Sequence, residues 1–196
     1  MAILKTGYHH GDLSTALIDA GLHLTRTGGP EALTIREATR RVGVSPNAAY
    51  RHFADREALL GAVGTAIQHR MATQMQRLSG STKPQAGDRL RAVGMGYIKF
   101  ALDEPGWFAV AFFGADPPVE TVAAPPYLAL VDALDAMVDA GTLSAERRVS
   151  AEWPCWSAVH GFAELALHGP LSHAGRRDVE ALARRTVDDI VTGVTG

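Results

Sequence analysis

The stretch TIREATRRVGVSPNAAYRHFADREALL, residues 34–60, decides the fold class. Thr34, with Glu37 three residues later, forms a capping box, which predicts a short helix that Gly43 ends. Ser45 stands directly before a proline, a combination typical of a helix start, so a second short helix is expected to follow. Two short helices joined by a tight glycine turn are the pattern of a helix-turn-helix, whose second helix enters the major groove of DNA.

The second short helix, expected from Pro46 to about His52, presents candidate DNA contacts. Ala49 and Phe53 lie four residues apart and can pack against the first helix, which turns the other side chains outward. An asparagine amide can donate to and accept from a base edge, an alanine can contact a thymine methyl group, and free amides at the helix N-terminus suit phosphate oxygens. The base-facing candidates are Asn47, Ala48, Arg51 and His52, the phosphate candidates are Tyr50, His52 and Arg56, and Pro46 lies at the N-terminus that bears the free amides.

Helical spacing of apolar residues dominates the whole chain, and alternating strand patterns are nearly absent, so the fold is predicted to be all-α with about nine helices. Capping residues, prolines and glycines set the ends of the helices outside the helix-turn-helix, the first of which Asp12 can cap. These helices are expected at about 12–28, 55–78, 90–104, 105–113, 130–140, 145–168 and 176–192.

Composition divides the chain near residue 78. Residues 1–78 hold nine Lys and Arg against six Asp and Glu, or +3, whereas the remainder holds ten against fifteen, or −5, which together give the net charge of −2. The stretch SGSTKPQAGD, residues 79–88, has the composition of a linker. We therefore expect a helix-turn-helix DNA-binding domain at 1–54, a connecting helix at 55–78, and a ligand-binding and dimerisation domain at 79–196.

Two helices of the second domain indicate a dimer. The helix expected at 145–168 is apolar on two sides, so one side can pack on its own domain while the other needs a second partner. The last helix is also apolar along one side. The predicted dimer-interface residues are Ala158, Phe162, Leu165, Val187, Ile190 and Val191.

Composition and motifs exclude several classes of protein. The longest unbroken apolar run is Trp107 to Phe113, and the N-terminus lacks the pattern of a secretory signal, so we expect a soluble, cytoplasmic protein. Cys155 is the only cysteine, which excludes an intrachain disulfide and a multi-cysteine zinc site, and neither a metal nor a cofactor is predicted. The common enzyme motifs, such as a phosphate-binding glycine-rich loop or a nucleophile elbow, are missing, so catalysis is not expected.

Three short motifs in the N-terminal part carry a family resemblance. GVS at 43–45, Tyr-x-His-Phe at 50–53 and an arginine followed by Glu-Ala-Leu-Leu at 56–60 resemble the TetR family of bacterial one-component transcriptional regulators, over residues 8 to about 70. A subgroup of that family is named for a Trp-His-Gly signature in its ligand domain. The segments similar to this subgroup are YHHGDL at 8–13, DRLRAVGMGYIKFALDEPGWF at 88–108, and the residues Trp156, His160 and Gly161.

The resemblance implies a dimer of nine-helix chains, in which the first three helices bind DNA and the last two pair the subunits. Thr39 departs from the small apolar residue usual at its place, and Ala38 is smaller than the usual aliphatic residue, so the packing of the first short helix needs a structural explanation. The resemblance also implies that DNA is commonly contacted at the positions of Thr34, Arg36, Asn47, Tyr50, His52 and Arg56.

These patterns together predict a repressor that leaves a near-palindromic DNA operator when a small apolar effector binds the second domain. The expected partners are double-stranded DNA, a second copy of the chain and this effector, with no membrane. For His160, a role in the core and a role in ligand contact both remain open. The alternatives are a ligand-independent helical DNA-binding module, a helical adaptor for another protein, and an enzyme. The predicted pocket walls are the aromatic residues Tyr97, Trp107, Phe113 and Trp156, together with His160.

Overall fold

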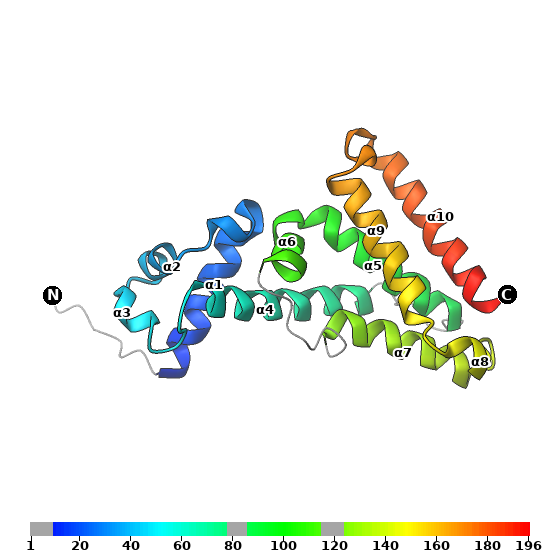
Figure 1. Cartoon of the computed structure of the whole chain (residues 1–196), viewed down its shortest axis with the longest axis horizontal. Coiled ribbons are helices and arrows are strands. Elements are labelled where there is room, and N and C mark those ends of the chain that lie inside the picture. Colours follow the sequence, from blue (N-terminus) through cyan, green and yellow to red (C-terminus); the bar gives the residue numbers. More distant parts are fainter. Residues whose placement is uncertain (1–9, 78–85, 115–123) are drawn as a thin grey trace. The chain divides into compact units, whose positions relative to one another are not determined.

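Helices alone make up the regular structure of the described residues, which are 10–77, 86–114 and 124–196 of the computed structural model (Figure 1). The all-α prediction is therefore confirmed. None of these helices is both long and apolar enough to cross a membrane. The α-helices are α1 (His10–Gly28), α2 (Ile35–Val42), α3 (Pro46–Ala49), α4 (Arg56–Arg77), α5 (Ala86–Asp103), α6 (Pro105–Phe113), α7 (Pro125–Asp139), α8 (Ala145–Arg148), α9 (Glu152–Leu167) and α10 (Arg176–Thr195), and short 3-10 turns lie at η1 (Pro30–Ala32) and η3 (Pro170–His173).

The chain forms two compact units, whose boundaries differ from simple sequence order. The first unit comprises residues 1–67 and 106–116, and the second comprises 68–105 and 117–196. Helix α4 contributes residues to both units, and nearly all of α6 belongs to the first. Of the predicted linker, residues 79–85 lie outside the described residues, as do Tyr8 and His9, whereas the residues from Ala86 onward already belong to α5. The domain division by function, at 1–54, 55–78 and 79–196, stays a prediction.

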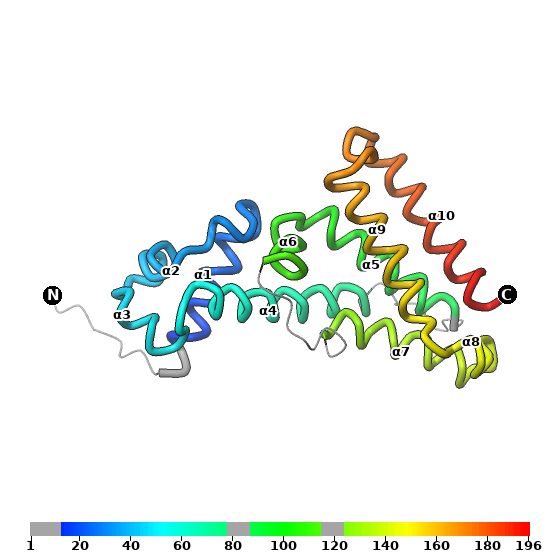
Figure 2. Tube along the Cα trace, viewed as in Figure 1, coloured from blue at the N-terminus to red at the C-terminus, as the bar shows by residue number. Residues whose placement is uncertain are grey.

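In the first unit, α1 packs against α2 and also contacts the start of α4. Leu17, Leu59 and Val63 are fully buried there. Gly21 brings the two helices close together, because a Cβ atom built at this glycine would lie 2.5 Å from the side chain of Val63. Figure 2 traces the short α2 and α3 beside α1, against which both of them pack. Helix α1 begins at His10, so the expected cap at residue 12 is wrong, since that residue already lies within the first turn.

Helix α4 has the cap and the buried stripe that its sequence predicts. The Asp55 carboxylate accepts a hydrogen bond from the backbone N–H of Ala58 at 2.7 Å and so satisfies one of the free amides at the helix start. The apolar residues at successive helical turns are all buried, which fixes the orientation of the helix within each unit. These residues are Leu59, Val63, Ile67, Met71 and Met75.

Helix α6 packs on the C-terminal end of α1 through a glycine and a tryptophan. A Cβ atom at Gly106 would lie 2.4 Å from the carbonyl oxygen of Arg26, so only a residue without a side chain fits here. The indole N–H of Trp107 donates to the carbonyl oxygen of Leu22 at 2.8 Å, and the Arg26 guanidinium lies over the indole ring, 5.1 Å from its centroid. The hydrogen bond and the cation–π contact join segments that are far apart in the sequence.

The second unit is organised around α5, which packs against α7, α9 and α10. Figure 1 shows α9 (yellow to orange) and α10 (orange to red) side by side and running in opposite directions. The single helix expected at 145–168 is wrong, because the chain is interrupted between α8 and α9. Ser150 has a φ of 59°, which an α-helix cannot continue through, and so the described residues hold one helix more than the nine expected.

Candidate nucleic-acid interface and apolar pocket

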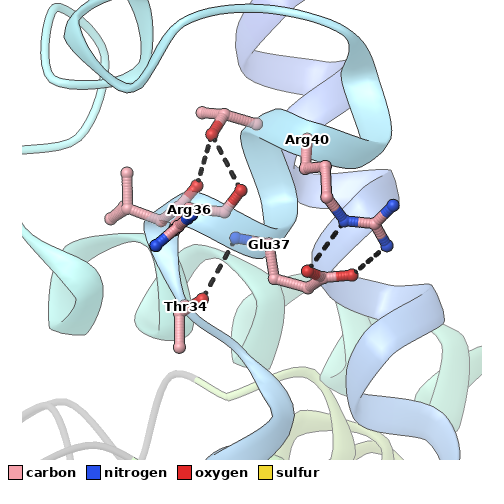
Figure 3. Close-up of polar contacts among 6 residues, drawn as sticks. Thr34, Arg36, Glu37 and Arg40 are labelled. Carbon is pink, nitrogen blue, oxygen red and sulfur yellow. Dashed lines mark hydrogen bonds and ion pairs between the residues drawn. The ribbon is translucent and has the colours of Figure 1, made fainter.

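The first helix of the helix-turn-helix is capped by Thr34, as Figure 3 shows. The Thr34 hydroxyl accepts a hydrogen bond from the backbone N–H of Glu37 at 3.1 Å, which confirms the predicted N-cap. The reciprocal half of the capping box is not formed, because the Glu37 carboxylate pairs instead with the guanidinium of Arg40, whose Nε lies 3.0 Å away. The hydrogen bond from Arg40 lowers the pKa of Glu37.

The turn and the second helix follow the prediction, with a shorter helix. Gly43 has a φ of 81°, in the left-handed region that favours glycine, and its N–H donates to the carbonyl oxygen of Thr39 at 2.9 Å. Ser45 is extended and Pro46 begins α3, but α3 ends at Ala49 rather than near residue 52. The chain continues as a hydrogen-bonded turn, in which the N–H groups of residues 52 and 53 both donate to the carbonyl oxygen of Ala49.

The buried side of this motif leaves the candidate DNA-contacting side on the surface. Ala38, Ala49 and Phe53 are buried, as the spacing of the second helix predicts, and α2 packs on α3. The Tyr50 side chain is 54% exposed, although it is aromatic. Of the predicted DNA contacts, Thr34, Arg36, Pro46, Asn47, Tyr50 and Arg51 are exposed, and Ala48, His52 and Arg56 are partly buried.

Thr39, the departure from the family pattern, is compatible with a buried position. Its side chain is buried. Its hydroxyl donates to the carbonyl oxygen of Ile35 at 2.8 Å, and the carbonyl oxygen of Arg36 is a second acceptor at 3.0 Å. Both acceptors belong to its own helix, α2. The hydroxyl therefore has a partner without disturbing a neighbouring helix, so it avoids the cost of an unsatisfied buried polar group.

Arg56 is held by the protein itself, and its contact with DNA phosphate stays a prediction. Its Nε donates to the carbonyl oxygen of Leu33 at 2.7 Å, and its Nη2 donates to that of Pro30 at 2.6 Å. A third nitrogen, Nη1, donates to the Glu57 carboxylate at 3.0 Å. The guanidinium thus ties the start of α4 to the segment before α2. Its role in the described structure is to position the helix-turn-helix.

An apolar pocket lies within the second unit, among α4, α5, α7, α9 and α10. It encloses about 370 Å³ that protein atoms do not fill, part of which is open to solvent. Residues from five helices form the wall, and nearly all of them are aliphatic or aromatic. The lining residues are Met75, Leu90, Val93, Gly94, Tyr97, Pro126, Leu130, Cys155, Trp156, Val159, Val187, Ile190 and Val191.

Tyr97 is the polar point of this pocket. Its hydroxyl shares a hydrogen bond of 2.7 Å with Nδ1 of His160. The ring of Trp156 lies edge-on to Tyr97, with centroids 5.2 Å apart, and stacks at 6.5 Å on the imidazole of His160. Burial raises the pKa of Tyr97 well above its usual value, with a further contribution from the negative charge of Glu164. The three rings therefore form one packed, hydrogen-bonded cluster between α5 and α9.

The structure brings together only part of the predicted ligand set. Tyr97 and Trp156 line the pocket, and His160 supports it through the Tyr97 hydroxyl. Trp107 and Phe113 belong to the other unit, where Trp107 packs on α1 and the Phe113 side chain is 55% exposed. The sequence did not predict the aliphatic lining residues, because their periodicity is that of any buried helix face. Gly94, a small residue inside an apolar stripe, is the sequence feature that could have indicated the pocket.

The predicted dimer residues also separate into two groups. Phe162, Val187 and Val191 are buried within a single chain, because the faces that carry them pack on other helices of the same unit. Ala158 and Ile190 are partly exposed, and the Leu165 side chain is 47% exposed. Ala158 and Ile190 line a shallow depression between α9 and α10. The other lining residues of this depression are Pro154, Thr186, Asp189, Gly193 and Val194.

Among the residues that the structure describes, Cys155 and the metal-ligand side chains show no reactive or metal-binding arrangement. Burial raises the pKa of the Cys155 thiol to about 11, which keeps it protonated. Within residues 10–77, 86–114 and 124–196, no three His, Cys, Asp or Glu side chains gather closely enough to hold a metal ion.

Comparisons with known proteins agree with this architecture. The family described as "Bacterial regulatory proteins, tetR family" matches residues 17–63, and the family described as "Tetracyclin repressor-like, C-terminal domain" matches residues 90–190, more than half of the chain. The chain therefore belongs to the TetR family, whose members are transcriptional regulators rather than enzymes. A search of curated protein sequences found no match.

Solved structures with this fold cover nearly the whole chain. A Rhodococcus sp. RHA1 protein of unknown function is 25% identical, with a TM-score of 0.76 over 98% of this chain and 100% of that one. A TetR variant from Acinetobacter baumannii AYE in complex with minocycline is 19% identical, with a TM-score of 0.67 over 95% of this chain and 96% of that one. A tetR-family regulatory protein from Rhodococcus RHA1 is 20% identical, with a TM-score of 0.64 over 94% and 97%.

Proposed function

We propose that this regulator is a repressor that binds a near-palindromic DNA operator and is released by a small apolar effector. The observation that carries the proposal is the helix-turn-helix, in which a buried alanine and phenylalanine fix α3 while the polar residues of that segment lie on the surface. The described structure gives the apolar pocket and the helix-turn-helix to different units, and α4 runs through both.

The exposed residues of α3 and its flanking turn divide into two proposed roles. Asn47 and Ala48 read base edges in the major groove, through the amide and the methyl contact of a small side chain. Tyr50 and His52 bind phosphate oxygens and fix the position of the helix, as do Thr34 and Arg36 at the start of α2. Arg51 is a further base-facing residue of this segment. Pro46 places the free amides of the helix start toward the DNA.

The test of operator binding is a mobility-shift assay with the DNA upstream of the protein's own gene. We expect a specific complex that competitor DNA of unrelated sequence does not displace, and whose affinity falls steeply as salt concentration rises, because lysine and arginine release counterions from the phosphates they neutralise. A helical adaptor for another protein would not retard this fragment specifically. Equal affinity for operator and unrelated DNA would contradict the repressor and would indicate a non-specific DNA-binding module.

We propose that the exposed faces of α9 and α10 pair two chains. Pro154, Ala158 and Leu165 lie along one face of α9, and Leu182 and Gly193 lie along the exposed face of α10. A face with small and apolar residues on both helices suits close packing against the same face of a second copy. The two helix-turn-helix motifs of a dimer would then read half-sites about 34 Å apart, or a multiple of this distance.

Replacing Leu165 with Glu should convert the dimer to monomers, because it places a charge in an apolar contact. Light scattering should give twice the chain mass of 20.8 kDa for the unmodified protein and about the single-chain mass for the variant. Leu128→Glu is the matched control, because Leu128 on α7 is exposed to a similar degree, 45% against 47%, and should leave the dimer intact. A monomeric mass for the unmodified protein at micromolar concentration contradicts the pairing.

We propose that the effector acts by favouring one conformation of the connected units. Met75, near the C-terminal end of α4, lines the pocket, and the same helix begins directly after the helix-turn-helix. A ligand alters DNA affinity only through its preference for one conformation over another, and a coupling of about 1–3 kcal/mol suffices for about a 5- to 150-fold change. We also propose that the chain belongs to the Trp-His-Gly subgroup, on the basis of Trp156, His160 and Gly161. In support, Trp156 lines the pocket and His160 is hydrogen-bonded to the Tyr97 hydroxyl.

A further inference from the structure

The ionisable groups in the pocket wall are held in their uncharged forms. Tyr97 and Cys155 are the ionisable side chains among the lining residues, and both are almost completely buried. The raised pKa values of the Tyr97 hydroxyl and of the Cys155 thiol, about 11 for the latter, keep both protonated at neutral pH. The pocket wall therefore carries no formal charge at neutral pH.

The histidine behind the wall is uncharged as well. His160 is half-buried, and this burial lowers its pKa in spite of the opposing effect of the nearby Glu164 carboxylate. Its Nδ1 is engaged with the Tyr97 hydroxyl at 2.7 Å, so the pair forms a neutral hydrogen bond rather than an ion pair. An imidazole in this state offers no positive charge to a carboxylate or phosphate ligand.

The Glu164 carboxylate acts electrostatically on this cluster, and Glu164 lies outside the lining residues. Its Oε2 is 3.1 Å from Nδ1 of the exposed His168, and about one-third of the Glu164 side chain is exposed. Its negative charge acts on Tyr97 and His160, which disfavours an anion at this end of the pocket.

We propose that the pocket takes an uncharged apolar molecule, with at most one hydrogen-bonding group placed at the Tyr97 hydroxyl, and rejects anionic molecules of the same shape. An anionic ligand would lose its hydration on entering a wall of aliphatic and aromatic groups, with no positive charge among the lining residues to compensate. This inference rests on the proposed function in one respect, that the effector binds in this pocket.

The test compares two probes with the same eight-carbon chain, 1-octanol and octanoate. Isothermal titration calorimetry of the unmodified full-length protein at neutral pH should show binding of 1-octanol and at least about tenfold weaker binding of octanoate, because an unpaired charge is costly to bury. This comparison uses no variant, so it does not depend on whether a substituted chain folds. The proposal is overturned if octanoate binds within about threefold of the alcohol, or if the alcohol does not bind.

A pair of variants locates the binding. Val159→Phe places extra volume in the pocket wall and should abolish 1-octanol binding, whereas Val149→Phe makes the same change at a side chain that is 75% exposed and should leave it unchanged. A folded Val159→Phe protein that still binds 1-octanol would place the ligand elsewhere and overturn the proposal. Failure of the repressor function has a different signature: binding of 1-octanol that leaves operator affinity unchanged counts against effector release and not against the neutral ligand.

Discussion

Gly106→Val should destabilise the protein strongly and lower its melting temperature. The introduced Cβ would lie 2.4 Å from the carbonyl oxygen of Arg26 and 2.5 Å from that of Thr25, and backbone atoms cannot turn aside as a flexible side chain can. Helix α6 would have to move away from α1, with loss of the indole hydrogen bond of Trp107 to Leu22. Overpacking of this kind costs about 1–3 kcal/mol, and each kcal/mol lowers the melting temperature of a chain of this size by about 2–4 °C.

Gly61→Ala is the matched control for this prediction. Gly61 lies inside α4, and a Cβ atom built on it would have nothing within 4 Å. Alanine favours a helix over glycine by about 1 kcal/mol, so this variant should be at least as stable as the unmodified protein. Thermal unfolding followed by circular dichroism measures both. A melting temperature of Gly106→Val equal to that of Gly61→Ala would mean that α6 does not pack on α1 as described.

The features that sequence predicts well are those set by a few neighbouring residues. Thr34 caps α2, Gly43 ends it in the left-handed region, and Asp55 caps α4, each through a contact within four residues. Such contacts depend on local backbone geometry that one side chain can satisfy, so the residue type alone identifies them. The buried face of α3 follows for the same reason, since helical spacing places Ala49 and Phe53 on one side.

The features that sequence misses depend on which helix packs against which. Nothing in the aromatic segment 105–113 indicates that its glycine and tryptophan pack on α1, because the partner residues lie far away in the sequence. Val187 and Val191 show the same limit: an apolar stripe predicts burial, but it does not distinguish a pocket in the same chain from a dimer contact. The break before α9 occurs at Ser150, whose positive φ no glycine announces.

The candidate DNA contacts show both cases within one motif. Exposure of Asn47, Tyr50 and Arg51 follows from the opposite, buried side of the same short segment. Arg56 has the right charge and the right position in the sequence, but two backbone carbonyls and a carboxylate hold its guanidinium. Residue type and spacing therefore identify the surface of a recognition segment, whereas the hydrogen-bond partners of a long side chain depend on the tertiary structure.

Arg51→Glu should reduce operator affinity by one to two orders of magnitude or more. Arg51 is exposed in the turn that follows α3, in the segment proposed to contact DNA. Loss of one arginine contact costs about 1–3 kcal/mol, and the new carboxylate adds repulsion from the phosphates. Titration of the operator at several salt concentrations should distinguish two roles for this arginine. If it neutralises a phosphate, the number of counterions released on binding should fall by about one. If it reads a base, the preference between DNA sequences should relax while the dependence of affinity on salt changes little.

Arg77→Glu separates this local effect from a change in overall charge. Arg77 is exposed at the C-terminal end of α4, in the second unit, and either substitution changes the net charge from −2 to −4. If the loss of affinity came only from the overall charge of the protein, the two variants would bind equally weakly. We expect Arg77→Glu to bind the operator within about threefold of the unmodified protein, because Arg77 lies outside the segment proposed to contact DNA. Equal affinities of all three proteins would contradict the assignment of the segment after α3 to the DNA interface.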